Sequence, residues 1–449
     1  MDSRGVRLRK IFAALGIVAV GFGLVDLVSS GRAHNATHAW AVDLDINWVA
    51  ANRLVDREPL YDRAAARAEG AEEIGPTMLR TGTGTFSSYI GTPATALAHA
   101  PFLVFDLDAA TALFRLLAAL GMIGALVLAA WALAPPARWA AALLGVGALF
   151  LGFPFVKTIA LGQGNELVML GIAVGIWAAT RDRWRLAGVG FGVATVLKIS
   201  PVLLVVYLVL RGRRQVLLPA IATAVGWTAL AAVVGRPGDL WVWARDVAPH
   251  VSPGTVSIYN QSLVGWISRI FTSGTDLSVN ASPGAVSWLA YAFAATVVVA
   301  LWRTRRARPL EPLELGIVVL VAVLAGPLSW DHYATWALIP LVLILDVTRW
   351  ARLRRVPIIV LTVALGISLV LLHGAILVPS PASVAADWSL RVGSGPYTIA
   401  LLIWLGVGWW LLARAPAADP ASPPGPYEAA TVPAPVARDD QAIAVGEPA

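Results

Sequence analysis

The chain has 449 residues, of which 58% are hydrophobic and 14% are charged, and its mean hydropathy is +0.71. Soluble domains carry about 25% charged residues, so the composition excludes an ordinary soluble enzyme and predicts an all-α polytopic membrane protein. The net charge of +7 comes from basic residues in short segments between apolar runs. That distribution is typical of cytoplasmic loops, so no nucleic-acid partner is expected. The chain has no cysteine, which excludes disulfides and thiolate metal sites.

Apolar runs recur along the chain and predict about 10–12 transmembrane segments. The first run lacks a cleavage signature, so it is expected to remain as an anchor. The basic clusters between the runs are predicted to be cytoplasmic, where acids are few and scattered. Besides a hairpin over 186–210, the expected spans cover about residues 11–30, 109–133, 139–156, 167–180, 216–234, 284–302, 313–328, 334–350, 357–377 and 395–413.

This scheme makes residues 1–414 one transmembrane domain with two long extracytoplasmic loops, 31–108 and 235–283. Within the first loop, residues 89–105 are apolar but short and interrupted by proline, which predicts an interfacial or re-entrant helix rather than a span. The last residues, 415–449, are rich in proline and acids and are expected to form a disordered cytoplasmic tail.

The apolar stretch 186–210 has basic residues at both ends and the sequence Lys198-Ile199-Ser200-Pro201 at its midpoint. A single crossing would leave one basic cluster outside, whereas two short helices broken at the proline keep both clusters inside. The stretch therefore predicts a broken-helix hairpin that presents Lys198 near the outer leaflet, where a charge is expensive and generally functional. The alternative is one tilted helix from which the lysine reaches the interface.

The segment that follows the first span predicts a helix that begins with carboxylates just outside the bilayer. Asp43 and Asn47 share one face of this helix, and Asp45 lies two residues after Asp43 in the same first turn. A carboxylate in this place is suited to act as a general base where a lipid-borne substrate meets water. Alternatively, Asp43 or Asp45 only caps the helix N-terminus.

Polar residues from separate segments converge on the outer side in this scheme. A transporter usually places its ionisable groups near the midplane in two related halves, and no matching half is found here. The asymmetry favours an enzyme with an extracytoplasmic active site. In addition to Asp43 as catalytic residue, the candidate substrate-binding residues are Asp45, Asn47, Lys157, Gln163, Asn165, Lys198, Asn260, Gln261, Trp330, Asp331 and His332.

Transfer of a sugar from a lipid phosphate fits this set of residues. A phosphate leaving group needs cations to hold its charge, which Lys198 can supply with Arg269 or His332 as helpers. The acceptor hydroxyl needs one carboxylate base. Two simpler readings remain open: Gln163 and Asn165 satisfy backbone groups at a helix break, and residues 330–332 belong to an interfacial belt.

The chain resembles the GT-C glycosyltransferases of family 87 in five ordered motifs within about residues 10–413. These are Asp43-Leu44 with Trp48-Val49-Ala50-Ala51 and Glu58-Pro59-Leu60-Tyr61-Asp62, Gly162-Gln163-Gly164-Asn165, Leu197-Lys198-Ile199-Ser200-Pro201, Asn260-Gln261-Ser262-Leu263, and Pro327-Leu328-Ser329-Trp330-Asp331-His332-Tyr333. Where many members carry Tyr-Pro-Pro after the first loop, this chain has Tyr89-Ile90-Gly91-Thr92-Pro93, which leaves acceptor specificity open.

The resemblance implies a GT-C fold and inverting transfer of mannose from polyprenyl-phosphate-mannose to a glycolipid or lipoglycan acceptor, with an α-1,2 link expected. It assigns Asp43 as the base and places His332 near the donor phosphate or sugar. No metal site and no cofactor are expected besides the lipid-linked donor. The alternatives are an arabinofuranosyltransferase that uses polyprenyl-phosphate-arabinose and a non-catalytic transporter or flippase of polyprenyl-linked lipids.

Overall fold

The computed structural model describes residues 3–32, 41–61, 78–80, 86–252, 254–271, 284–373 and 388–414. These residues are predominantly helical, and the all-α polytopic class is confirmed. The described part of the first loop adds a two-stranded antiparallel sheet of β1 (Met78–Arg80) and β2 (Phe86–Ser88). The expected tail, 415–449, lies outside the described residues, as do parts of both long loops.

Six described helices are long and apolar enough to cross a membrane. They are α1 (Ser3–Ser29), α6 (Leu107–Trp131), α12 (Leu217–Val234, preceded by η3, Arg214–Val216), α16 (Gly284–Arg305), α20 (Arg355–His373) and α23 (Pro396–Ala413). A seventh crossing is made if α7 (Arg138–Leu151) and α8 (Phe153–Leu161), which meet at 65°, count as one span. The expected number of about 10–12 full spans is therefore not found in the described part of the chain.

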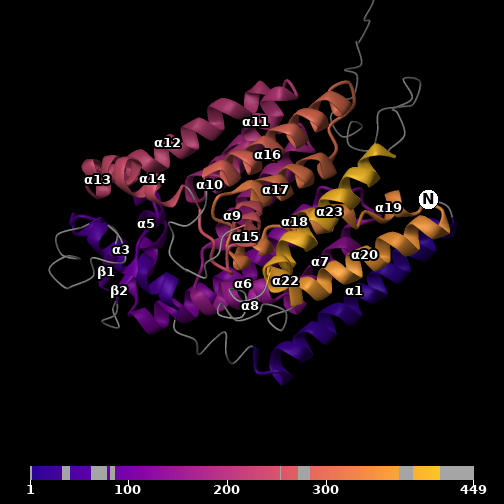
Figure 1. Cartoon of the computed structure of the whole chain (residues 1–449), viewed down its shortest axis with the longest axis horizontal. Coiled ribbons are helices and arrows are strands. Elements are labelled where there is room, and N and C mark those ends of the chain that lie inside the picture. The colour runs from indigo at the N-terminus through magenta and orange to yellow at the C-terminus, as the bar shows by residue number, and fades with distance from the viewer. Residues whose placement is uncertain are drawn as a thin grey trace, which may run out of the picture.

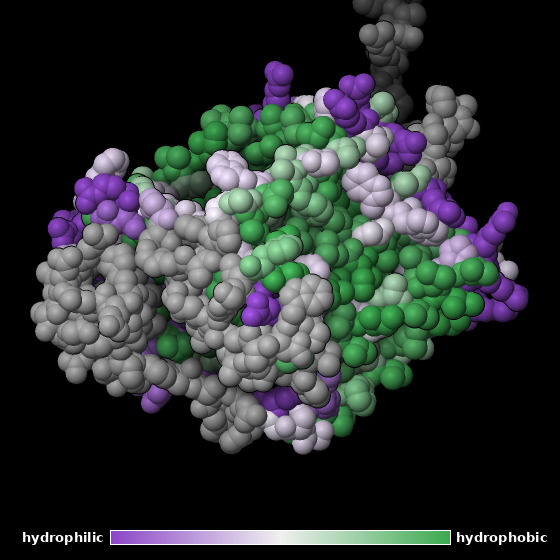
Figure 2. All heavy atoms as spheres, viewed as in Figure 1, coloured by the Kyte–Doolittle hydropathy of each residue, from purple (hydrophilic) through white to green (hydrophobic). Residues whose placement is uncertain are grey.

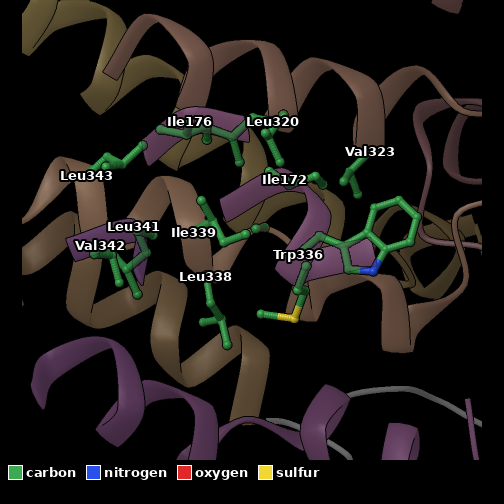
Figure 3. Packing of buried hydrophobic residues seen from close by; sticks show 14 of the residues in the cluster. Ile172, Ile176, Leu320, Val323, Trp336, Leu338, Ile339, Leu341, Val342 and Leu343 are labelled. Carbon is green, nitrogen blue, oxygen red and sulfur yellow. The ribbon is translucent and has the colours of Figure 1, made fainter. Parts of the chain in front are cut away.

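The remaining apolar segments fold as shorter helices. Those with largely buried residues are α9 (Asn165–Ala179), α17 (Pro312–Ala325) and α18 (Leu338–Ile344), whereas α10 (Trp184–Leu197) and α11 (Val202–Leu210) also carry exposed apolar side chains. Every residue of α17 is buried, and in Figure 3 its Leu320 and Val323 face α18 together with Ile172 and Ile176 of α9. Helices that are covered by protein rather than lipid do not need full membrane length, because broken backbone is tolerated there. The apolar composition of a segment therefore does not distinguish a helix covered by protein from one that faces lipid.

The elements from the two loops that the sequence predicts to be extracytoplasmic gather at the end of the bundle away from the N-terminus (Figure 1). They include α3 (Val42–Val55), α5 (Pro93–His99) with η2 (Ala100–Val104), and α13 (Pro237–Val242), which runs through a π-helical turn, η4 (Trp243–Val247), into α14 (Ala248–Val251). The other short elements are α15 (Leu263–Phe271), η5 (Asp331–Thr335), α19 (Val347–Trp350) and α22 (Trp388–Gly393). Figure 2 shows a broad hydrophobic surface along the helices, with hydrophilic residues at the end near the N-terminus.

Small residues allow α1 and α7 to pack closely. A Cβ added to Gly16 would lie 2.6 Å from the Cβ of Leu143, and one added to Gly147 would lie 2.5 Å from the Cβ of Ala19. Close backbone approach of this kind is the main source of helix association in lipid. Where α7 ends, the carbonyl of Leu151 accepts hydrogen bonds from Arg32 (3.3 Å) and His373 Nδ1 (2.6 Å). The sharp bend thus leaves this buried acceptor satisfied.

The predicted hairpin is formed by α10 and α11, which are separated by residues 198–201. Gly188 approaches the carbonyl of Val216 and Gly192 approaches that of Ala220, so α10 and α12 run in parallel and α11 must return between them. The guanidinium of Arg213 also lies 4.7 Å from the ring of Trp184, which brings the two ends of the hairpin together. A single tilted helix is therefore wrong for this stretch.

The end of the bundle that carries the basic clusters contains a buried ion network. Glu314 is fully buried, accepts a hydrogen bond from Tyr207 (2.5 Å) and pairs with Arg211 and with Arg305 (3.2 Å). Arg305 also pairs with Glu311. The expectation that acids on this side are few and scattered misses this network, because the partners lie far apart in sequence. The network joins α11, α16 and α17.

We expect Glu314→Ala to lower the free energy of unfolding by about 3–5 kcal/mol, because two buried guanidinium groups lose their shared carboxylate. Thermal unfolding of the purified protein in detergent measures this. The matched control is Glu58→Ala, whose side chain is 57% exposed and which should change stability by less than about 0.5 kcal/mol. Equal melting temperatures for the two variants would contradict a stabilising role of the network.

Candidate active site

The break between α10 and α11 places Lys198 at the end of the hairpin opposite Arg213 and Trp184. The helix α10 stops at Leu197, and Lys198 takes an extended conformation with φ −145° and ψ 126°. Its Nζ donates to the hydroxyl of Tyr333 (2.5 Å) and lies 4.6 Å from the centroid of that ring. No carboxylate pairs with Lys198 among the residues that the structure describes. Lys198 is thus a half-buried cation held by a neutral group.

Asp43 lies in the first turn of α3 but does not cap the helix. The N-cap is Ala41, and no side chain makes a capping hydrogen bond there. Instead, Gln163 Nε2 donates to Asp43 Oδ2 (2.6 Å). The two residues meet because Gly162 ends α8 in a left-handed conformation, φ +71°, against Leu44 of α3. The carboxylate of Asp43 is therefore oriented by an amide from a distant segment.

Asp331 forms a buried ion pair with Lys157. Lys157 Nζ lies 2.6 Å from Asp331 Oδ2 and 3.9 Å from the centroid of the Tyr259 ring. The backbone N–H of His332 donates to Asp331 Oδ1 (2.8 Å). Burial opposes ionisation of Asp331, but its interactions with His332 and Lys157 hold the pKa of the carboxyl below its usual range. Asp331 is thus ionised, and it neutralises Lys157 rather than Lys198.

His332 lies among these charged groups and is only 4% exposed. Its Nδ1 is 3.5 Å from Asp331 Oδ1, and its ring meets Tyr333 edge-on with centroids 4.9 Å apart. Burial lowers the pKa of His332, against the opposing effects of Asp331 and Asp43, while Lys198 lowers it further. The imidazole is therefore neutral near pH 7. Since Lys198 bonds to the adjacent Tyr333 (2.5 Å) and Asp331 precedes His332, both charged groups lie beside the imidazole, and Asp43 also contributes to its pKa.

Three of the predicted amide side chains make hydrogen bonds to backbone carbonyls in and around the segment that carries Asp331 and His332. Asn165 donates to the carbonyl of His332 (3.3 Å) and accepts from the indole of Trp336 (3.1 Å). Asn260 donates to the carbonyl of Pro327 (2.9 Å), and Gln261 donates to that of Ser394 (2.9 Å). All three amides are buried and bonded to protein. Their geometry is that of supports for the loop that carries Asp331, rather than of groups directed at a ligand.

Three other candidates lie nearby without joining the cluster. Asn47 donates to the backbone carbonyl of Asp43 within its own helix (2.6 Å). Asp45 is only 1% exposed, in contrast to the half-buried Asp43. Trp330 is half-buried and its backbone pairs with Asn260 as an isolated bridge. The helper proposed from sequence, Arg269, is buried and donates to Ser257 and Ser394, so it also braces the fold.

Sequence reasoning missed three aromatic or titratable side chains here. Tyr333 and Tyr259 each lie against one of the two lysines, and His99 lies within electrostatic range of Lys198. Tyr333 follows His332 directly in the last motif, which could have indicated it. Apart from the phenol of Tyr89, His99 is the one ionisable side chain in the apolar stretch 89–105, and that isolation was a usable signal.

The cluster contains the carboxylate of Asp43 and the ammonium group of Lys198. In the described part of the chain, Lys198 forms no ion pair with a carboxylate. Such a pair can deprotonate a hydroxyl and hold the charge of a phosphate. Within the described ranges, no three histidine or acidic residues lie close enough together to hold a metal ion.

Comparison with known proteins agrees with this chemistry. The sequence model of glycosyltransferase family 87 matches residues 89–329, more than half of the chain. The match begins after α3 and ends one residue before Trp330, so it contains Lys157, Gln163 and Lys198 but neither Asp43 nor Asp331.

Curated relatives extend the similarity over most of the chain. A Mycobacterium tuberculosis protein named polyprenol-phosphate-mannose-dependent α-(1-2)-phosphatidylinositol mannoside mannosyltransferase is 26% identical over 391 residues, 83% of each chain. Its namesake in Mycolicibacterium smegmatis is 24% identical over 430 residues, 91% of this chain and 88% of the relative. A pentamannoside mannosyltransferase of M. tuberculosis is 32% identical over 194 residues, 42% of each chain.

The turn that joins Gln163 to Asp43 can be tested by adding one methyl group. A Cβ at Gly162 would lie 2.5 Å from the Cβ of Leu44, in a backbone conformation that disfavours side chains. We expect Gly162→Ala to destabilise the protein by about 1–3 kcal/mol, measured as a lower melting temperature in detergent. The control is Gly164→Ala, since Gly164 has φ −76° and no atom within 4 Å of an added Cβ. Similar losses in both variants would show that the turn is not constrained by α3.

Proposed function

The chain belongs to glycosyltransferase family 87, and on this basis we propose that it transfers a mannosyl residue from polyprenyl-phosphate-mannose to a lipid-anchored glycan. The relatives that cover most of the chain are named for this donor and for a phosphatidylinositol mannoside acceptor. Their names also support an α-1,2 link. They do not favour an arabinose donor, and family membership does not favour a transporter or flippase.

In the proposed reaction, the acceptor hydroxyl attacks the anomeric carbon of the donor sugar and inverts its configuration. Asp43 takes the hydroxyl proton as the new C–O bond forms. Gln163 holds Asp43 Oδ2 (2.6 Å), so that the carboxylate presents its other oxygen to the hydroxyl. The bond between the anomeric carbon and the phosphate oxygen breaks, and its electron pair remains on the phosphate.

Lys198 receives the phosphate in this proposal. The departing oxygen gains charge, and an ammonium group beside it stabilises that charge without giving up a proton. Lys157 is less suited to this task because its charge is already matched by Asp331 (2.6 Å). The proposal is supported by hydrogen bonds that reach the same short segment from both sides. Gln163 bonds to Asp43 (2.6 Å), Asn165 of the same turn bonds to the carbonyl of His332 (3.3 Å), and Lys198 bonds to the neighbouring Tyr333 (2.5 Å).

The site is proposed to open on the extracytoplasmic face of the plasma membrane. The elements that carry it lie at the end of the bundle away from the N-terminus (Figure 1). The opposite end holds the basic residues of the hairpin and the network around Glu314. Positive residues favour the cytoplasmic side, which supports an outward-facing site that receives both lipid-linked substrates from the membrane.

We expect Asp43→Asn to lower the transfer rate by about 10²–10⁴-fold, because the hydroxyl loses its base. The measurement is transfer of radiolabelled mannose from purified donor in membranes that contain the variant. Asp56→Asn is the matched control, since it removes an exposed carboxylate at the other end of the same helix and should leave the rate unchanged. Transfer by Asp43→Asn at more than about a tenth of the wild-type rate would rule Asp43 out as the base.

We expect Lys198→Ala to raise the donor KM by about tenfold to a hundredfold while the acceptor KM changes little, because a charged hydrogen bond to the phosphate is lost. Initial rates with each substrate varied in turn give the two constants. Lys10→Ala, which removes an exposed lysine from the N-terminal turns of α1, should alter neither. Equal increases in both constants for Lys198→Ala would count against the phosphate role.

A further inference from the structure

The last residue of α5, His99, is a buried histidine that the proposed mechanism does not use. Its side chain is 4% exposed, and its ring stacks on Phe114 with centroids 5.6 Å apart and planes inclined by 20°. Nδ1 lies 2.8 Å from the carbonyl oxygen of Thr95, one turn back in the same helix. The stacking and the hydrogen bond together fix the plane and the direction of the imidazole.

The bond to Thr95 determines which nitrogen of His99 carries the proton. A carbonyl oxygen can only accept, so Nδ1 donates and Nε2 keeps a lone pair in the neutral ring. Burial lowers the pKa of His99 to about 4, and the ammonium of Lys198 acts in the same direction. Hence the ring is neutral near pH 7, and its Nε2 is an acceptor.

That acceptor is unused within the described part of the chain. Nε2 is shielded from solvent and no described group lies within hydrogen-bond distance of it. A buried polar atom without a partner is costly and uncommon, and such atoms frequently mark sites that serve a ligand. Because Nε2 is shielded from bulk solvent, a hydrogen bond formed there is stronger than one at the surface.

The surroundings of His99 indicate which part of a ligand it meets. The helix α5, which ends at His99, packs against α10, whose C-cap is Lys198. The charge of Lys198 also contributes to the lowered pKa of His99. His99 therefore lies on the Lys198 side of the site, where the donor phosphate is proposed to bind. A phosphodiester has only acceptor oxygens toward Nε2 and would be repelled, but the sugar attached to that phosphate carries hydroxyl donors.

We propose that His99 Nε2 accepts a hydrogen bond from a hydroxyl of the donor sugar, which makes His99 a positioning and specificity residue for the mannosyl group. This inference rests on the proposed function, because it takes the donor to be a sugar linked to a polyprenyl phosphate. In this proposal His99 contacts the sugar, whereas Lys198 contacts the charged phosphate. A neutral acceptor discriminates between sugars through the position of their hydroxyls.

The test compares binding of two lipids, polyprenyl-phosphate-mannose and polyprenyl phosphate, to the full chain in nanodiscs without acceptor. His99→Phe retains the aromatic stacking on Phe114 but has no acceptor atom. We expect it to weaken binding of the mannosylated lipid by about tenfold and to leave binding of polyprenyl phosphate unchanged. His99→Gln, whose amide oxygen can reach the position of Nε2, should restore much of the loss.

Donors that lack one hydroxyl identify the group that His99 contacts. One of the mono-deoxy mannose donors should bind the wild type about tenfold more weakly than the full donor, and His99→Phe should not distinguish them. The inference is overturned if His99→Phe weakens both lipids equally, or if it discriminates among the deoxy donors as the wild type does. If instead the wild type shows no preference for the mannosylated lipid, the proposed function fails together with this inference.

Discussion

The ion pair between Lys157 and Asp331 determines which charged groups in the rest of the site are paired and which are not. It joins α8 to η5 across a long distance in sequence, and its two atoms lie 2.6 Å apart in a largely buried setting. A buried pair of this kind adds little net stability, but neither charge can be left alone without a large penalty. The pairing therefore commits Asp331 to Lys157, whereas Lys198 contacts the hydroxyl and ring of Tyr333.

The backbone around this pair is supported by buried side chains rather than by regular structure. Residues 254–262 and 326–330 are irregular segments at the end of the bundle. Asn260 and Gln261 satisfy their backbone groups, with Asp331 N–H bonded to the carbonyl of Tyr259 (2.8 Å). Irregular backbone at membrane depth is stable only where such partners exist. The amides predicted as sugar contacts thus contribute through the shape of the loop.

The sequence predicts the hairpin because the charge rule and the proline agree on it. Basic residues at both ends of 186–210 exclude one crossing, and Lys198 precedes the breaker Pro201. The convergence of Asp43, Gln163 and Lys198 is also predictable, since their motifs fall on one side of that topology. The number of helices that cross the membrane is not predictable in this way, because α9 and α17 are as apolar as lipid-facing helices yet are shielded by protein.

Pairings across long separations are equally hidden from sequence. Nothing near Glu314 reveals that Arg211 of the hairpin will contact it. The position of His99 relative to Lys198 is also hidden from sequence, because it depends on how α5 packs against α6 and α10. Periodicity and motif order fix which segments face outward, but they do not fix which side chains meet. For that reason the proposed base and cation are foreseeable, whereas the groups that orient them are not.

The charges of the site explain how the proposed transfer can proceed where water is scarce. Lys157 and Asp331 form an ion pair, Asp43 and Lys198 carry opposite charges without pairing directly among the described residues, and His332 and His99 are neutral. In the proposed reaction the proton reaches Asp43 as negative charge develops on the phosphate. One carboxylate charge disappears while one phosphate charge forms, so the sum within the site is unchanged. Because the fixed dipoles and ammonium groups need not reorganise for a change in total charge, the low-dielectric surroundings assist the step rather than oppose it.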